Sequence, residues 1–192
     1  MPRSTVTLYA LVAIIAIFVI YRFVGSYTPL STNESITPIE DKGAYGEWKE
    51  FTAPTGKFKA LFPLHPRHVA ESSQDPYTQS VRRYNIYVSE QLDSTIYMIT
   101  SVNFTEKFNP EKDDRILTNT VTDMVSSNGQ NALVSMDETT FQGRKSVKFQ
   151  IDNGKTNHIE GITFVADKTL YILTRISKKG NVNDEEFERF IR

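Results

Sequence analysis

The histidines are the residues whose types and spacing could support chemistry in this chain. The sequence contains 3 His and 0 Cys, which excludes thiolate nucleophiles, thiolate metal ligands and disulfides. His65 and His68 lie three residues apart, a spacing that suits a metal ion when a helix places both rings on one face. Pro66 lies between them and argues against a helix interior. We therefore predict no metal and interpret the two metal candidates, His65 and His68, as solvated turn residues.

A second candidate site consists of His158 and Glu160. They alternate with Ile162 and Phe164 along one predicted strand, so all of these side chains share a face. A neutral imidazole beside a carboxylate can act as a general base. Such a pair more often forms a surface salt bridge or hydrogen bond, and no G-x-S-x-G nucleophile elbow accompanies it. We predict a non-catalytic protein and keep this pair as the catalytic candidate.

Motifs for nucleotides and nucleic acids are absent from the sequence. It has neither a G-x-G-x-x-G loop nor a Walker sequence. The net charge is −1, so no basic field attracts nucleic acid. The basic pairs Arg82-Arg83 and Lys178-Lys179 are short and scattered. We predict no cofactor and no nucleic-acid partner.

A long apolar segment lies at the start of the sequence. Residues 6–24 read VTLYALVAIIAIFVIYRFV, and the stretch 5–24 is close to the ~20 residues that cross a bilayer core. Tyr9 and Tyr21 suit the membrane interfaces, and Arg22 can extend its charge to the water. We predict one transmembrane anchor within residues 1–25, which contacts the membrane through residues 5–24.

A cleaved signal peptide is the main alternative for this segment, with Val24-Gly25-Ser26 as the best cleavage site, and a buried core helix is another. Arg3 and the terminal amine precede the apolar run, whereas Arg22 is followed by several acidic residues. The positive-inside rule then places the N-terminus in the cytoplasm. We predict a single-pass protein of the cell membrane whose soluble domain lies on the extracytoplasmic side.

The anchor is followed by a tether and one domain. Residues 26–44 are rich in Ser, Thr and Pro and lack apolar periodicity, as in a flexible tether. Residues 45–192 form the predicted domain. Its strand signals include the alternation in 146–151 and 95–104, while 170–176 is apolar on both faces and predicts cover on both sides of a sheet. Turn signals separate these strands into antiparallel hairpins, at 142–144, 153–155 and 167–168.

Two helices are predicted in this domain. The first begins with Asn109 as N-cap and Pro110 at the first helical position. Its apolar stripe consists of Ile116, Leu117, Val121, Met124 and Val125, and Asn128-Gly129 ends it. The second begins near Asn183 and packs through Phe187, Phe190 and Ile191. The pattern indicates an α+β domain with helices on a mostly antiparallel sheet, preceded by the transmembrane helix.

The domain also resembles the PsbP-like family in its apolar positions and turns. The resemblance covers 45–192 and rests on Trp48, FKALFPLHP (58–66), a strand led by Gly143, the Phe164 and 170–173 strands, and the terminal Phe187/Phe190 helix. It implies an α/β/α sandwich in which the 58–62 strand ends at an edge, where Pro63 and Pro66 turn the chain.

The same resemblance implies a role in binding or assembly through a protein partner, without catalysis. No functional residue of the family transfers, because the matching positions belong to the scaffold. The membrane anchor separates this chain from the soluble photosynthetic and nuclear-import members, and it looks most like an anchored bacterial member of unknown role. Two alternatives remain open: a membrane-tethered hydrolase that uses His158 and Glu160, and a domain that binds a small ligand or lipid in a cleft between sheet and helix.

Overall fold

The computed structural model describes residues 47–74, 81–104, 109–181 and 183–192. The predicted anchor (1–25) and tether (26–44) lie outside these ranges. Within the described ranges, no helix combines the length and hydropathy needed to cross a membrane. The division of the chain into anchor, tether and domain therefore stays a prediction.

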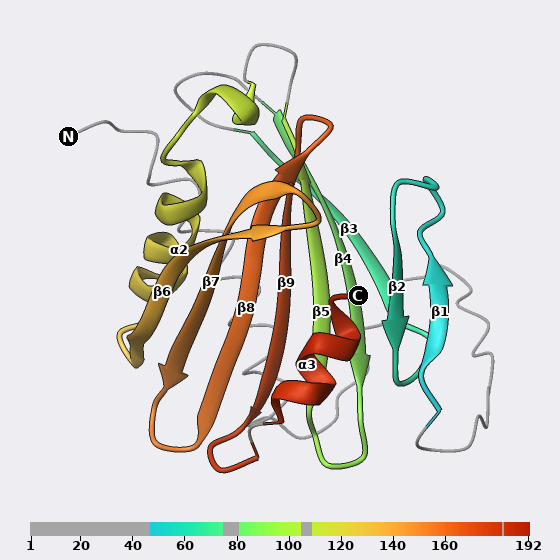
Figure 1. Ribbon diagram of the computed structural model, residues 1–192, viewed down its shortest axis with the longest axis vertical. Helices are drawn as coiled ribbons and strands as arrows, with labels where there is room; N and C mark the ends of the chain where they lie inside the picture. Colours follow the sequence, from blue (N-terminus) through green and yellow to red (C-terminus); the bar gives the residue numbers. More distant parts are fainter. Residues whose placement is uncertain (1–46, 75–80, 105–108, 182) are drawn as a thin grey trace.

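The described residues form two small helices, a 3-10 turn and nine strands (Figure 1). The elements, in chain order, are β1 (Lys49–Thr52), β2 (Lys59–Phe62), β3 (Arg67–Gln74), β4 (Val81–Glu90), β5 (Ile96–Asn103), η2 (Pro110–Lys112), α2 (Ile116–Ser126), β6 (Asn131–Phe141), β7 (Arg144–Asn153), β8 (Asn157–Ala166), β9 (Thr169–Lys178) and α3 (Asp184–Phe190).

Seven of the strands form one antiparallel sheet in the order β3-β4-β5-β9-β8-β7-β6, and β1 and β2 form a separate hairpin. Each of the segments β3–β5 and β6–β9 is a meander, in which consecutive strands are neighbours. The β5–β9 pair joins the two meanders, with Ile96 opposite Ile176 and Asn103 opposite Thr169. The predicted α+β class with a mostly antiparallel sheet is confirmed.

The predicted turns lie where the sequence signals place them. Gln142 and Gly143 link β6 to β7 with φ angles of 48° and 75°, and Asp167 and Lys168 link β8 to β9 with φ angles of 48° and 60°. Two consecutive positive φ angles are the signature of the hairpin turn whose twist matches that of the strands. These short links explain why β6 to β9 follow one another as neighbours.

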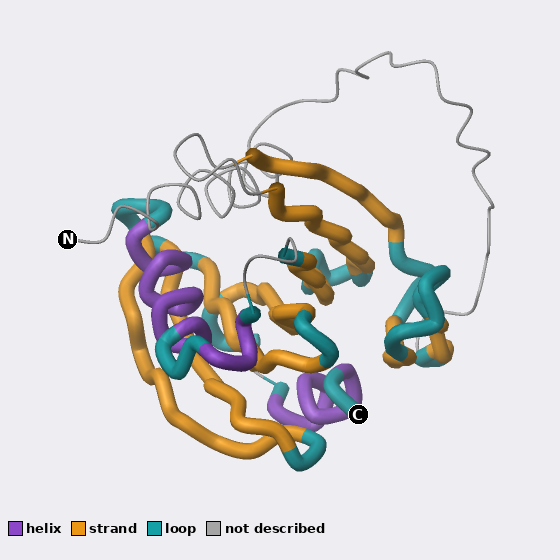
Figure 2. The backbone as a smooth tube through the Cα atoms, turned by 90° about the horizontal axis from the view of Figure 1, so that it is seen from above, coloured by secondary structure: helices purple, strands orange, loops and turns teal. Residues whose placement is uncertain are grey.

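Helices cover both faces of the sheet. On one face α2 packs Leu117 and Val121 against a cluster that includes Phe149 of β7. On the other face α3 packs Phe187 and Phe190 into a second cluster that also takes in the β1–β2 hairpin. In Figure 2 this hairpin lies at the opposite side of the molecule from α2. Strand β9 contributes to both clusters, as its two-sided apolar pattern predicts.

The first predicted helix begins later than expected. Asn109 caps only the short η2 turn, where its side chain accepts a hydrogen bond from the Glu111 N–H at 3.0 Å. The chain then becomes extended at Asp113, whose carboxylate accepts from the Arg115 N–H at 3.0 Å. This local hydrogen bond competes with helix continuation, so α2 starts at Ile116. The predicted apolar stripe is confirmed.

The second predicted helix is confirmed at its start. Asn183 has an extended backbone and accepts from the Glu186 N–H at 3.3 Å, and α3 begins at the next residue. Phe187 and Phe190 are 1% and 0% exposed. Because so short a helix is not stable alone, these two rings hold it on the sheet.

The strand within FKALFPLHP ends after Phe62, as predicted, but it does not belong to the main sheet. β2 pairs with β1, from Lys59 opposite Thr52 to Phe62 opposite Lys49. Pro63 and Pro66 are buried, and the chain enters β3 directly afterwards. The edge strand at this side of the main sheet is therefore β3.

Replacing Asp123 of α2 should change the free energy of unfolding by an amount that depends on pH. Asp123 is 3% exposed, and burial raises the pKa of its carboxyl to about 6, while the charge of Arg82 opposes this rise. The native state then binds the proton more tightly than the unfolded chain, so the free energy of unfolding falls as pH rises from about 4 to 6. We expect Asp123→Asn to raise it by about 2–3 kcal/mol at pH 7 and to leave it nearly unchanged below pH 4.

Urea unfolding followed through the fluorescence of Trp48, the one tryptophan of the sequence, would measure this difference. Asp137→Asn, at an exposed position of β6, is the matched control and should change the free energy of unfolding by less than about 0.5 kcal/mol. An equal effect of Asp123→Asn at both pH values would contradict the assignment.

Candidate functional site

The two residues predicted as a catalytic pair each bind a different partner. His158 and Glu160 lie on β8 and are 8% and 2% exposed. His158 Nδ1 lies 2.9 Å from Asp152 Oδ1, and the other oxygen of Asp152 lies 2.8 Å from Lys179 Nζ. The hydrogen bonds from His158 and Lys179 lower the pKa of Asp152 below its usual value. The interpretation of His158 and Glu160 as a mutual surface pair is wrong, because both are buried and separately bonded.

Glu160 forms a buried ion pair with Arg175 of β9. Arg175 Nη1 donates to Glu160 Oε1 at 2.9 Å, and the two side chains are 0% and 2% exposed. Burial raises the pKa of Glu160, and the hydrogen bond from Arg175 opposes this rise. Burial acts to lower the pKa of Arg175, but hydrogen bonds to Glu160 and Tyr97 outweigh it and raise that pKa. The two groups lie at hydrogen-bond distance, so each stabilises the charged form of the other.

The guanidinium of Arg175 also fastens the C-terminal segment to the sheet. Its Nη2 donates to the Asn181 carbonyl at 2.9 Å and lies 3.5 Å from Glu186 Oε2. The Tyr97 hydroxyl donates to the same Glu186 oxygen at 2.8 Å. We call Tyr97, Glu160, Arg175, Asn181 and Glu186 the Arg175 network. It links β5, β8 and β9 to α3, so its role is to hold the fold.

Asp93 extends this arrangement to the loop between β4 and β5. Its carboxylate accepts from the backbone and hydroxyl of Thr95 at 2.9 and 3.0 Å, and from the Asn181 amide at 2.8 Å. Burial alone would raise the pKa of Asp93, but these hydrogen bonds lower it. The loop and the segment before α3 are thereby fixed to each other.

The strand register also brings Ser177 opposite His158, which is itself opposite Asp152. These are the residue types of a serine hydrolase. However, Ser177 Oγ and His158 Nε2 are shielded from solvent, and each lacks a hydrogen-bond partner among the described residues. A substrate cannot reach the hydroxyl, and the imidazole does not contact it, so this set does not form an active site.

His65 and His68 each pack against a different aromatic ring. His65 is exposed, and its ring lies edge-on to Phe51 at 5.5 Å between centroids. His68 lies in β3 rather than in a turn, because pairing with β4 resumes directly after Pro66. Its ring stacks on Tyr87 at 4.6 Å. Across the described residues, no group of three potential metal-binding side chains gathers.

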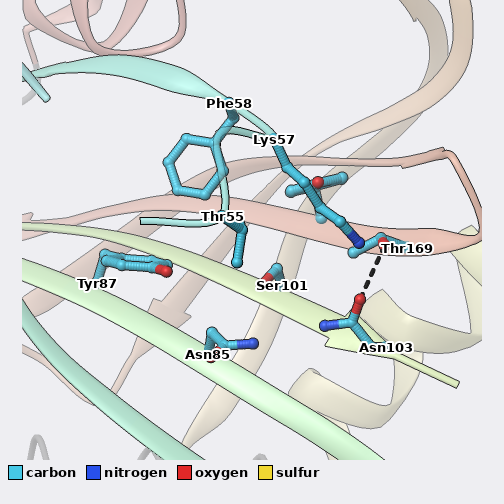
Figure 3. A pocket seen from close by; sticks show the side chains of 9 residues that line it. Thr55, Lys57, Phe58, Asn85, Tyr87, Ser101, Asn103 and Thr169 are labelled. Atoms are coloured by element: carbon cyan, nitrogen blue, oxygen red, sulfur yellow. Dashed lines mark hydrogen bonds between the residues drawn. The ribbon is translucent and has the colours of Figure 1, made fainter. Parts of the chain in front are cut away.

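A small pocket lies between the β1–β2 loop and one face of the sheet (Figure 3). Strands β4, β5 and β9 form its floor, and the loop before β2 covers it. The lining residues are Thr55, Lys57, Phe58, Asn85, Tyr87, Ser101, Asn103, Thr169 and Tyr171. Polar side chains from several elements meet here at an accessible surface, so we consider the pocket the candidate binding site.

Two asparagine amides of the floor are fixed by neighbouring side chains. Asn103 Oδ1 accepts from the Thr169 hydroxyl at 3.0 Å. Asn85 Oδ1 lies 3.2 Å from His68 Nε2, which donates to it in the matching tautomer. With both oxygens engaged, the two amide nitrogens point toward each other across the pocket (Figure 3).

Aromatic rings form another part of the wall. Phe58 lies edge-on to Tyr87 and Tyr171, with centroid distances of 5.3 and 6.0 Å. Burial raises the pKa of both tyrosines, so their hydroxyls stay protonated at neutral pH. The pocket thus combines apolar ring surface with neutral hydrogen-bonding groups and the ammonium of Lys57.

Comparisons with known proteins place limits on what can be transferred to this chain. No family model and no curated protein matches it. It is similar to cyanobacterial PsbP (CyanoP) from Synechocystis, with 12% identity and a TM-score of 0.49, over 79% of this chain and 94% of that one. It is also similar to a Pseudomonas aeruginosa protein of unknown function, with 7% identity and a TM-score of 0.37, over 74% and 91%. This likeness concerns the fold at most, and membership of the PsbP-like family stays a prediction.

One signal for the pocket is present in the sequence. On the pocket-facing side of 95–104, Tyr97 and Ile99 are followed by Ser101 and Asn103. When polar residues occupy the covered face of a central strand, no apolar element packs on the sheet at that point. The partners of these residues, Thr169 and the Lys57 loop, lie far away in the sequence and could not be named from it.

Proposed function

We propose that this chain is a single-pass membrane protein whose α+β domain binds a partner outside the cytoplasm, as part of an assembly and without catalysis. One observation carries the proposal. The two side chains of the catalytic candidate, Glu160 and His158, bind Arg175 and Asp152 inside the fold, whereas the accessible pocket presents hydrogen-bonding groups.

The membrane part of the proposal is supported by the sequence. Residues 5–24 are apolar over a length that matches a bilayer core, and the polar tether gives the domain reach from the surface. The distribution of basic residues around the apolar segment favours an external domain.

Protease treatment of intact spheroplasts tests both topology and anchoring. We expect external protease to digest the domain, and the untreated protein to stay in the membrane fraction with an N-terminus near Met1. A cytoplasmic protein in the same cells must survive as the control. Protection of the domain would contradict the external location, and a released chain that begins near Ser26 would contradict the anchor.

A further inference from the structure

We propose that the pocket under the β1–β2 loop binds small organic acids through their carboxylate group. This inference rests on the proposal that the domain binds rather than catalyses, and it names a ligand class for the site. Three properties of the pocket carry it: the direction of its hydrogen-bonding groups, its charge and its aromatic wall.

The pocket presents donors. The oxygens of Asn85 and Asn103 are occupied by His68 and Thr169, so each asparagine offers its NH₂ group to the interior (Figure 3). The protonated hydroxyl of Tyr87 and the hydroxyl of Ser101 can donate as well. A carboxylate accepts hydrogen bonds only, on two oxygens, and matches such a set.

The charge of the pocket has the sign that a carboxylate needs. Lys57 is the one ionised side chain among the nine lining residues, and none of them is Asp or Glu. A neutral sugar would gain only hydrogen bonds in this pocket, whereas a carboxylate would also gain the attraction of the Lys57 ammonium. The positive charge, together with the inward-facing amide NH₂ groups, therefore favours an acid over a polyol.

The aromatic wall fits the remainder of such a ligand. Phe58, Tyr87 and Tyr171 surround the polar floor, with Phe58 edge-on to both tyrosines. Rings in this arrangement offer apolar surface to a flat or aliphatic body. A molecule with one carboxylate and a small apolar body matches both the polar floor and the aromatic wall of the pocket.

Titration of the full chain in detergent micelles with 4-fluorobenzoate, followed by ¹⁹F line broadening, tests the inference. We expect a Kd of the order of 1 mM, which is typical of a ligand of about ten heavy atoms. Asn103→Asp is the decisive variant, because it keeps an oxygen for the Thr169 hydroxyl and replaces the donor by an anionic oxygen. Its Kd should be at least tenfold higher than that of the wild type.

Asn119→Asp is the matched control, since it adds the same charge at an exposed position of α2 and should leave the Kd unchanged. Absence of binding to the wild type, equal binding to Asn103→Asp, or equally tight binding of neutral 4-fluorobenzamide would each overturn the inference. These results are independent of the spheroplast assay, so a failure here is distinguishable from a failure of the proposed membrane function.

Discussion

Arg175→Met is expected to lower the free energy of unfolding by about 3–5 kcal/mol, the range measured when one member of a buried ion pair is removed. Glu160 would keep a buried carboxylate without its 2.9 Å partner. The Asn181 carbonyl would lose its donor, and Glu186 would lose one of its two contacts in the network. Since a domain of this size has a total stability of about 5–15 kcal/mol, a large part of it depends on this one side chain.

A double variant separates the loss of charge pairing from the loss of volume. In Arg175→Met/Glu160→Leu no unpaired charge remains between β8 and β9, so we expect the double variant to recover much of the stability lost in the single one. Arg144→Met, which removes an exposed arginine, is the control and should change stability by less than about 0.5 kcal/mol. Urea unfolding of all variants gives the comparison. If the double variant is as unstable as Arg175→Met, the cost does not come from a buried charge.

Gly161→Ala should destabilise the protein by about 3 kcal/mol, at the upper end of the range for overpacked cores. A Cβ atom at this position of β8 would lie 2.3 Å from Phe149 Cζ and 2.8 Å from the carbonyl oxygen of Leu173. The ring of Phe149, opposite Gly161 in the register, occupies the space that a side chain would need. The backbone carbonyl cannot rotate away as a side chain could, because Leu173 lies in the middle of β9.

Two further comparisons make this prediction specific. Gly129→Ala serves as the matched control, because nothing lies within 4 Å of its added Cβ. The change at Gly161 should cost less in a Phe149→Leu background than in the wild type, since the smaller side chain leaves room for the methyl group. Thermal or urea unfolding of the wild type, the three single variants and the double variant provides the measurement. Additive costs of the changes at Gly161 and Phe149 would show that the ring is not the obstacle.

Local patterns were sufficient to predict much of the fold. The alternation in 146–151 and the turn residues at 142–143 predict β7 and its link to β6, because strand pleat and turn geometry depend on neighbours in sequence. Asn183 predicts the start of α3 for the same reason. The predicted start of α2 at Asn109 was wrong because the side chain of Asp113 accepts a hydrogen bond from a backbone N–H that a continuous helix would use.

The candidate site could not be predicted from local patterns, because it depends on contacts between residues far apart in the sequence. Glu160 and its partner Arg175 face each other only through the β8–β9 register. A carboxylate two residues after a histidine gives no indication of that partner. The pocket combines three strands and a loop, whose positions depend on strand order. His68 was interpreted as a turn residue because Pro66 marks an end for the preceding strand but says nothing about the strand that follows.

The β5–β9 pair has a consequence for how quickly the domain can fold. Each meander is made of contacts between neighbours in sequence, which form with little loss of chain entropy. Pairing of Asn103 with Thr169 must instead close the long segment that contains η2, α2 and β6 to β8, and this closure costs entropy before any contact rewards it. We expect this closure to limit the rate of folding, and until the two meanders meet, β5 and β9 each expose the strand edge that the other will pair with.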